Sequence, residues 1–364
     1  MPDIPSDAID QSRLYAMLHN RSGTLSPGDG VPDPLIMSSA FALSAQPDPT
    51  RTYARTGTPT VQAAEARLAL LEDAPTLLFP SGMGAYGALL MSSLKAGDRI
   101  LLLSDGYYAA RSLTDQVLAP FDISFDTVSA TNIADAPLDG YAMVLIESPS
   151  NPRLDVIDIA NLASRAHAAG ARLVVDNTVC TPLLQRPLDL GADAVIVSDT
   201  KAMAGHSDLL LGHVSTRDNA LMERLVTTRN FAGAIPAPFE AWLFIRGLET
   251  LELRLAAMCA NARALLPLLE AAPGAQNIIY PKPHPQASDQ GFLIGATFAD
   301  AATADRFLEL AGFTPTTSFG GLHSSGDRRA RWGDDVPPGF LRLSIGIEPT
   351  GPLCAAVERA LAAL

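Results

Sequence analysis

The sequence has little positive charge. Its 26 lysine and arginine residues face 39 aspartate and glutamate residues, which gives a formal net charge of −13. A chain of this sign offers no basic stripe to neutralise phosphates, so we expect no nucleic-acid partner. The same acidity opposes attraction to an anionic membrane surface, so we expect no membrane partner either.

Cysteines and long apolar runs are also scarce. Cys180, Cys259 and Cys354 are far apart and include no CxxC pair, which argues against a disulfide framework and a zinc ribbon. No apolar run approaches the roughly 18 residues that a membrane span needs. The N-terminal MPDIPSDAIDQSR lacks the basic and apolar regions of a signal peptide. These features predict a cytoplasmic protein.

Lysine is also rare, with three copies against 23 arginines. Lys95 lies in the turn-like LKAGDRI, and Lys282 lies in the proline-rich YPKPHP. Lys201 lies in SDTKAMAGHSDLLLGH, directly after an apolar run. Surface solvation does not explain this third position, which therefore predicts a chemical role.

Apolar runs and helical patterns alternate along the chain and predict an α/β fold. Strands are expected at 76–79, 99–104, 143–148, 172–177 and 194–199. Strands this apolar, with helices between them, predict a mostly parallel sheet that is covered on both faces. We expect an irregular arm (1–50), a large domain (51–238), and a smaller α/β domain (239–364) that opens with a long helical segment at 239–272.

Polar residues gather after these strands. In an open parallel sheet, ligands bind beyond the carboxyl ends of the strands. Those ends carry Ser81-Gly82-Met83, Tyr107-Tyr108, Glu147, Asp176-Asn177-Thr178 and Ser198-Asp199-Thr200-Lys201. Pyridoxal phosphate needs a lysine for a Schiff base, a carboxylate beside its ring nitrogen, an aromatic face, and hydroxyl and N–H groups for its phosphate. The set meets all four needs.

The order of motifs along the chain resembles the Cys/Met-metabolism (trans-sulfuration) family of pyridoxal-phosphate enzymes. The resemblance covers nearly the whole chain and implies the aminotransferase-like fold type I. It is carried by YARTGTPT (53–60), FPSGMGA (79–85), SDGYY (104–108), ESPSNP (147–152), VVDNT (174–178), SDTKAMAGHSDLLLGH (198–213), TSFGG (317–321) and LRLSIGIEP (341–349). The segments GHSDLLLGH, GAIPAPFEAW and RRARWGDDVPPGF resemble a bacterial branch usually described as cystathionine γ-lyases.

The resemblance also implies roles for individual residues. Lys201 would form the Schiff base and move protons, Asp176 would pair with the ring nitrogen, and Thr178 would support the ring. Tyr108 would stack on the ring and protonate the leaving sulfur. The phosphate would be bound by Ser81, Gly82, Met83, Ser198 and Thr200, together with Tyr53 and Arg55 of a neighbouring subunit. Arg342, with Asn151 and Ser318, would bind the substrate carboxylate. The family pattern implies a homo-oligomer, a tetramer built as a dimer of dimers.

Several alternatives stay open. His323 occupies a position that is often glutamate in family γ-lyases, and Ala109-Ala110 replaces a Gly-Gly pair. We expect cystathionine γ-lyase activity on a sulfur amino acid; cystathionine β-lyase, methionine γ-lyase and homoserine-ester γ-synthase chemistry are the alternatives within the family. GMGAYG (82–87) superficially fits a nicotinamide-binding fingerprint, but no acidic residue follows at the right distance. A non-catalytic role is disfavoured because every expected catalytic position is filled.

A metal site is not expected. His206 and His213 are seven residues apart, a spacing without recognised ligand geometry, even with Asp199 and Asp208 nearby. We expect His206 to support the lysine loop by hydrogen bonding, and Cys180 to be a small buried apolar side chain.

Overall fold

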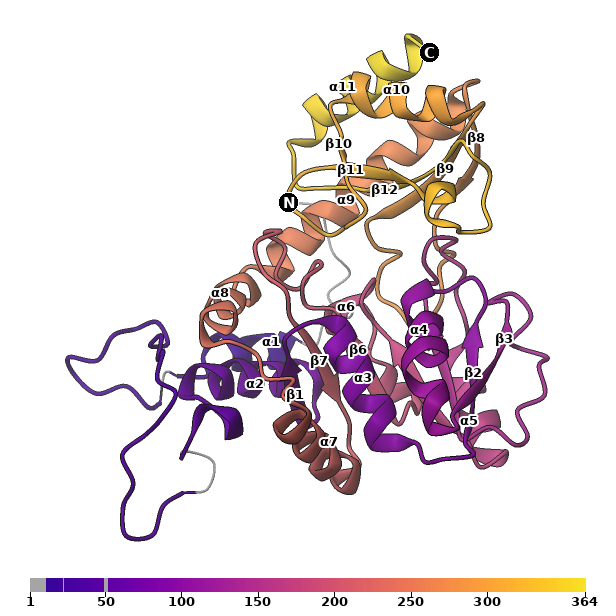
Figure 1. Ribbon diagram of the computed structural model, residues 1–364. Coiled ribbons are helices and arrows are strands. Elements are labelled where there is room, and N and C mark those ends of the chain that lie inside the picture. Colours follow the sequence, from indigo (N-terminus) through magenta and orange to yellow (C-terminus); the bar gives the residue numbers. More distant parts are fainter. Residues whose placement is uncertain (1–10, 22, 49–51) are drawn as a thin grey trace.

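The structure is a computed structural model that describes residues 11–21, 23–48 and 52–364. Residues 1–10, 22 and 49–50 of the predicted arm lie outside this range, as does residue 51. Figure 1 shows two β-sheets, one in each half of the molecule, which are connected by the long helix α9 (Leu251–Ala271).

The larger sheet has seven strands within the described residues, in the order β1-β7-β6-β5-β4-β2-β3. Its strands are β1 (Thr76–Phe79), β2 (Arg99–Leu103), β3 (Ser124–Val128), β4 (Met143–Glu147), β5 (Arg172–Asp176), β6 (Ala194–Val197) and β7 (Gly212–Ser215). All five predicted strands are present. Five adjacent strands, β3 to β6 in the sheet order, are parallel, and β7 is antiparallel to both of its neighbours. The predicted mostly parallel sheet is therefore confirmed.

Apolar residues cover both faces of this sheet. Alternate residues of a strand point to opposite faces, so Ile100 and Leu102 pack with one core, whereas Leu101 and Leu103 pack with another. The first core includes α3 (Gly82–Ser93) and α7 (Asn219–Ala232). The opposite face is covered by α2 (Pro59–Glu72), α5 (Ile159–Ala168), α6 (Thr181–Leu184) and α8 (Pro238–Leu248).

The smaller sheet has the order β10-β11-β12-β9-β8. Its strands are β8 (Ala275–Ile279), β9 (Leu293–Phe298), β10 (Thr314–Pro315), β11 (Ser325–Arg328) and β12 (Phe340–Ser344). Helices α10 (Ala301–Ala311) and α11 (Thr350–Ala362) cover its side away from the larger sheet (Figure 1). The remaining elements are α4 (Tyr108–Leu113), η2 (Ala54–Thr56), η3 (Thr114–Leu118), η4 (Ala119–Phe121), η5 (Pro187–Leu190) and η6 (Arg329–Trp332).

The structure differs in local detail from the segments expected from sequence. The helical segment 239–272 is divided into α8 and α9. The predicted irregular arm contains α1 (Gln11–Leu18), because Leu14 and Met17 are spaced to bury one helical face together. Strands β3 and β7 were not expected, because the first has largely exposed residues and the second consists of only four residues, one of them a histidine. No helix in the described ranges is long and apolar enough to cross a bilayer.

Candidate active site

A cavity of about 260 Å³ lies beyond the carboxyl ends of the parallel strands. It is also lined by side chains from the smaller sheet and its loops. The lining residues are Ser81, Gly82, Met83, Tyr86, Tyr107, Tyr108, Glu147, Asn151, Asp176, Thr178, Ser198, Thr200, Lys201, Leu210, Thr317, Phe319, Arg329 and Arg342. The fold thus gathers most of the predicted site residues around one space.

The start of helix α3 forms a cradle suited to a phosphate. Ser81 caps the helix by accepting a hydrogen bond from the Gly84 N–H at 3.0 Å. The first N–H groups of a helix have no partner within the helix, and they favour an anion. A Cβ atom at Gly82 would lie 2.8 Å from the Ser198 Cβ atom, so only glycine lets these two segments approach so closely.

Threonine hydroxyl groups from two other loops lie beside this cradle and hold its loops in place. The Thr178 hydroxyl accepts a hydrogen bond from the Ser198 N–H at 2.8 Å and so fixes the two strand ends together. The Thr200 hydroxyl donates to the Leu211 carbonyl and accepts from the Leu211 N–H, each at 3.1 Å. Thr200 therefore lines the cavity while its hydroxyl already has two backbone partners.

Asp176 ends strand β5 and is fully buried in the site. Its Oδ1 atom accepts from the Thr178 N–H at 2.9 Å, and its Oδ2 atom accepts from the Tyr86 hydroxyl at 2.6 Å. Glu147 is its register partner on strand β4. Burial raises the pKa of both carboxyl groups, and Asp176 raises the pKa of Glu147 further. Two neighbouring buried carboxyl groups at the strand ends favour a cationic group in the cavity beside them, such as a protonated ring nitrogen.

Lys201 faces the cavity from the loop after β6. Its ammonium donates to the Ser318 Oγ atom at 2.9 Å, and its nitrogen lies 5.2 Å from the centre of the Phe319 ring. Burial, followed by the charges of Arg342 and Arg329, lowers the pKa of Lys201 to about 8. A lysine with this pKa has an appreciable neutral fraction near neutral pH, and the neutral amine is the form that attacks an aldehyde.

Arg342 lies on β12 and is held in place by one residue of each domain. Its Nη1 donates to the Asn151 Oδ1 atom at 2.8 Å, and its Nη2 donates to the Thr317 carbonyl at 2.6 Å. Its Nε atom is buried without a hydrogen-bond partner. Burial and then the charge of Arg329 lower its pKa to about 10, which leaves it a cation at neutral pH. Arg342 lines the cavity, and a guanidinium cation there is suited to a carboxylate ligand.

The two predicted aromatic residues are adjacent. The rings of Tyr107 and Tyr108 are 5.4 Å apart in an edge-on arrangement. Tyr108 is 47% exposed, so its ring can serve as an open platform for a planar ligand.

Tyr53 and Arg55 do not line this cavity in their own chain, where the described lining residues all come from positions 81 to 342. Both are at the start of the η2 turn; the Arg55 guanidinium lies 5.7 Å from the Tyr53 ring, and Tyr53 is half exposed. Their predicted role in a neighbouring subunit's site stays a prediction.

Four further residues line the cavity although their role was not predicted from the sequence: Tyr86, Thr317, Phe319 and Arg329. Tyr86 follows Gly82 by four positions on α3, and helical spacing places such residues on one face, so a signal existed. Arg329 lies in η6 and donates to the Thr317 hydroxyl and to Asp327, at 3.1 and 2.9 Å. No sequence pattern indicated that this turn reaches the cavity.

His213 is part of a buried cluster behind the lysine loop. Its Nδ1 atom lies 2.8 Å from Asp199 Oδ1, and its Nε2 atom lies 3.2 Å from Glu72 Oε1. His206 instead bonds the Ala204 carbonyl at 2.6 Å, within the lysine loop, as expected. Within the described part of the chain, no group of three potential ligands is arranged to hold a metal ion.

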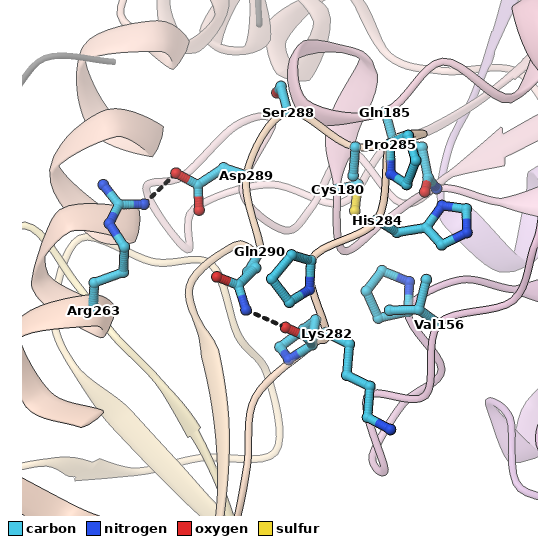
Figure 2. Close-up of a pocket in the computed structure, with 14 residues that line it drawn as sticks. Val156, Cys180, Gln185, Arg263, Lys282, His284, Pro285, Ser288, Asp289 and Gln290 are labelled. Carbon is cyan, nitrogen blue, oxygen red and sulfur yellow. Dashed lines mark hydrogen bonds and ion pairs between the residues drawn. The ribbon is translucent and has the colours of Figure 1, made fainter. Parts of the chain in front are cut away.

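A second cavity, of about 510 Å³, lies between the large domain and the proline-rich loop 281–290 (Figure 2). Lys282 and His284 line it, and Arg263 is paired there with Asp289. Cys180 also faces this cavity, and burial raises the pKa of its thiol to about 12, so it is the unreactive buried residue that was expected. None of the predicted site residues lines this second cavity.

The site around Lys201 fits pyridoxal phosphate by its own chemistry. A phosphate cradle that a Cβ atom would fill, a buried carboxylate for a ring nitrogen, an aromatic platform and an amine of lowered pKa meet in one cavity. The GMGAYG segment forms the cradle, so it fits this cofactor without a nicotinamide. Asp176, Lys201 and Gly82 would bind its ring nitrogen, aldehyde carbon and phosphate, respectively.

Comparisons with known proteins agree with this chemistry. The family model described as Cys/Met metabolism PLP-dependent enzyme matches residues 18–362. The chain is 40% identical to a putative cystathionine γ-lyase of Streptomyces coelicolor, over 93% of each chain. It is 33% identical to a cystathionine β-lyase of Lactococcus lactis, over 95% of this chain and 97% of the other.

Solved structures show the same fold. A cystathionine γ-synthase from Xanthomonas oryzae, in complex with cystathionine, superposes with a TM-score of 0.90 at 31% identity, over 96% of this chain and 97% of the other. The expected fold type I, the cofactor and the enzymatic nature of the chain are thereby confirmed. The chain belongs to the Cys/Met metabolism family of pyridoxal-phosphate-dependent enzymes.

Proposed function

We propose that the chain is a cystathionine γ-lyase, which converts cystathionine and water to cysteine, 2-oxobutyrate and ammonia. The observation that carries this proposal is that Lys201, whose pKa is lowered to about 8, and the cationic Arg342 line the same cavity. An amine and a carboxylate-binding cation together suit an α-amino acid. The three relatives named above support the substrate class, since each is named for a reaction that consumes or forms cystathionine.

Each residue of the cavity has a proposed task. Arg342 and Asn151 orient the α-carboxylate, so that the Cα–H bond faces the Lys201 amine. Bound pyridoxal phosphate supplies an electron sink for the negative charge that develops when this proton leaves. The Lys201 amine then also moves the Cβ proton. Its lowered pKa suits both transfers, because the neutral amine can accept a proton and the ammonium that results can readily donate it again.

The sulfur end of the substrate needs a proton as the Cγ–S bond breaks. The Tyr108 hydroxyl is the proposed donor, because this side chain lines the cavity and is half exposed toward the entering substrate. Ser318 accepts a hydrogen bond from Lys201 and would hold the amine in position between the two proton transfers.

Product analysis tests this assignment. The purified holoenzyme is given cystathionine, and the keto acid is identified by chromatography. We expect 2-oxobutyrate with cysteine. Pyruvate with homocysteine as the main products would instead identify a β-lyase. Methionine and homoserine esters are tested in parallel, and faster turnover of either would replace the proposal with methionine γ-lyase or γ-synthase activity.

We also propose that the active unit is a homo-oligomer, a tetramer of two dimers, in which Tyr53 and Arg55 complete the site of a neighbour. Their exposed position outside their own cavity supports this. Arg55→Ala and Lys201→Ala subunits are inactive separately in this scheme. Mixing and reassembling them creates one intact site per mixed dimer, so activity should return to about a quarter of wild type. No recovery after verified subunit exchange would contradict the shared site.

A further inference from the structure

Tyr86 is a buried titratable residue that none of the roles above uses. It lies on α3 among apolar residues, and its hydroxyl is directed away from them toward Asp176. The distance from the hydroxyl oxygen to Asp176 Oδ2 is 2.6 Å, as is typical of a charge-assisted bond between a hydroxyl and an ionised carboxylate. Burial, and then the neighbouring Asp176 and Glu147, raise the pKa of Tyr86 well above its usual value, so it remains a donor.

The surroundings of Asp176 make this donor consequential. The titratable and polar groups that line the cavity with it are Tyr86 from α3, Thr178 from its own strand end, Glu147 from β4, Tyr107 from the turn before α4, Lys201 from the loop after β6, and Arg342 and Arg329 from the smaller domain. Burial raises the pKa of Asp176 and so favours its protonated form. Hydrogen bonds from Thr178 and from the Tyr86 hydroxyl, followed by the charge of Lys201, lower this pKa and favour the anion.

Protonation of Asp176 would prevent it from forming an ion pair with the ring nitrogen of the cofactor. This inference rests on the pairing proposed above. A carboxylic acid cannot accept the ring N–H as an ion pair. A carboxylate that is too basic would remove the ring proton altogether, and the cofactor would then be a weaker electron sink. The donors on Asp176 must therefore lower its proton affinity below that of the ring nitrogen.

We propose that Tyr86 is a positioning residue that keeps Asp176 ionised and turned toward the ring nitrogen of the cofactor. The hydroxyl lowers the basicity of Oδ2 by hydrogen bonding and fixes the plane of the carboxylate. Its effect on the reaction passes entirely through Asp176. A purely structural tyrosine would instead use Asp176 only to satisfy its own buried hydroxyl.

The test compares Tyr86→Phe with Tyr141→Phe. Phenylalanine retains the ring that packs in the core and removes only the hydroxyl. Tyr141 is a matched control because its hydroxyl also donates to an aspartate, Asp126, at 2.9 Å, but on the exposed surface. Two properties are measured without turnover: the dissociation constant of pyridoxal phosphate for cofactor-free protein, and the nitrogen-15 NMR shift of the ring nitrogen in labelled cofactor.

We expect Tyr86→Phe to weaken cofactor binding about tenfold at neutral pH, the loss expected for one hydrogen bond to a charged group. The loss should grow as the pH falls, because Asp176 becomes protonated more easily. The nitrogen-15 signal should move toward the value of an unprotonated ring. Tyr141→Phe should match wild type in both measurements.

A second background separates this inference from the proposed site. In Asp176→Asn protein, Tyr86→Phe should change neither measurement further, because the group through which it acts is gone. Persistence of the effect there, or wild-type values in Tyr86→Phe alone, would overturn the role of Tyr86. If Asp176→Asn itself binds the cofactor normally with a protonated ring, the proposed site fails instead. Tyr86→Leu, with the same predictions, replaces the phenylalanine variant should that protein not fold.

Discussion

Replacing Lys201 with methionine should stabilise the cofactor-free protein. Lys201 is largely buried beside two arginines, and the protein lowers its pKa from 10.5 to about 8. The folded state therefore disfavours the ammonium, whereas the unfolded chain solvates it freely. Methionine has a similar length without a charge, so Lys201→Met removes this conflict while it leaves the packing largely unchanged.

The magnitude follows from the pKa. Each pKa unit corresponds to about 1.4 kcal/mol, so the charged lysine costs the folded state about 3 kcal/mol at pH 7. The variant also loses the hydrogen bond to Ser318, and this loss offsets about 1 kcal/mol of the gain in stability. The net expectation is a gain of about 2 kcal/mol in the free energy of unfolding at pH 7.

The stability difference between wild type and Lys201→Met depends on pH in a direction that follows from the lowered pKa of Lys201. Between pH 8 and 10.5 the unfolded chain retains the proton that the folded protein has lost, so wild-type stability rises with pH relative to the variant. The advantage of Lys201→Met should therefore be full below pH 8 and gone above pH 10.5. Urea unfolding of both cofactor-free proteins at several pH values measures it. A variant that is less stable than wild type at pH 7, or a pH-independent difference, would refute the reasoning.

Three further predictions concern the cradle, the carboxylate-binding arginine and the buried histidine. Gly82→Ala places a Cβ atom 2.8 Å from the Ser198 Cβ atom and should weaken cofactor binding at least tenfold in a fluorescence titration; unchanged affinity would contradict the cradle. Arg342→Lys keeps the charge but loses the planar fork, so KM for cystathionine should rise about tenfold or more, with a smaller change in kcat; a change in kcat alone would count against the role. Although burial alone would lower the pKa of His213, Asp199 and Glu72 raise it to about 10. The charged imidazole of His213 therefore stabilises the fold fully below pH 6.5, and this stabilisation is lost as the pH rises through about 10. In urea unfolding, His213→Gln should lose more stability relative to wild type at pH 6 than at about pH 10. An equal loss at these two pH values would exclude a stabilising charge on His213.

Much of the site was predictable because the end of an apolar run in the sequence marks the end of a buried strand. Asp176 and Lys201 each follow a buried run, and the sheet topology brings such positions together at one edge. Strand β7 was not predicted, because His213 interrupts its apolar pattern. This histidine can be buried there because the carboxylates of Asp199 and Glu72, from other segments, bind its ring nitrogens.

The missed lining residues depend on tertiary structure. The spacing of Tyr86 from Gly82 places both on one face of α3, but the buried face of this helix is mostly apolar, so Tyr86 resembles an ordinary core residue until Asp176 is placed beside it. Arg329 reaches the cavity only because the smaller sheet packs over the larger one. The proposed contributions of Tyr53 and Arg55 require a second chain, which no pattern within one chain can position.

One measurement tests the central claim most directly. The purified holoenzyme is reduced with borohydride, digested and examined by mass spectrometry for the pyridoxyl phosphate mass on each of the three lysines. The account predicts the added mass on the peptide that contains Lys201, and on neither of the peptides that contain Lys95 and Lys282. An adduct on either of those two, or a complete lack of one in active protein, would contradict it.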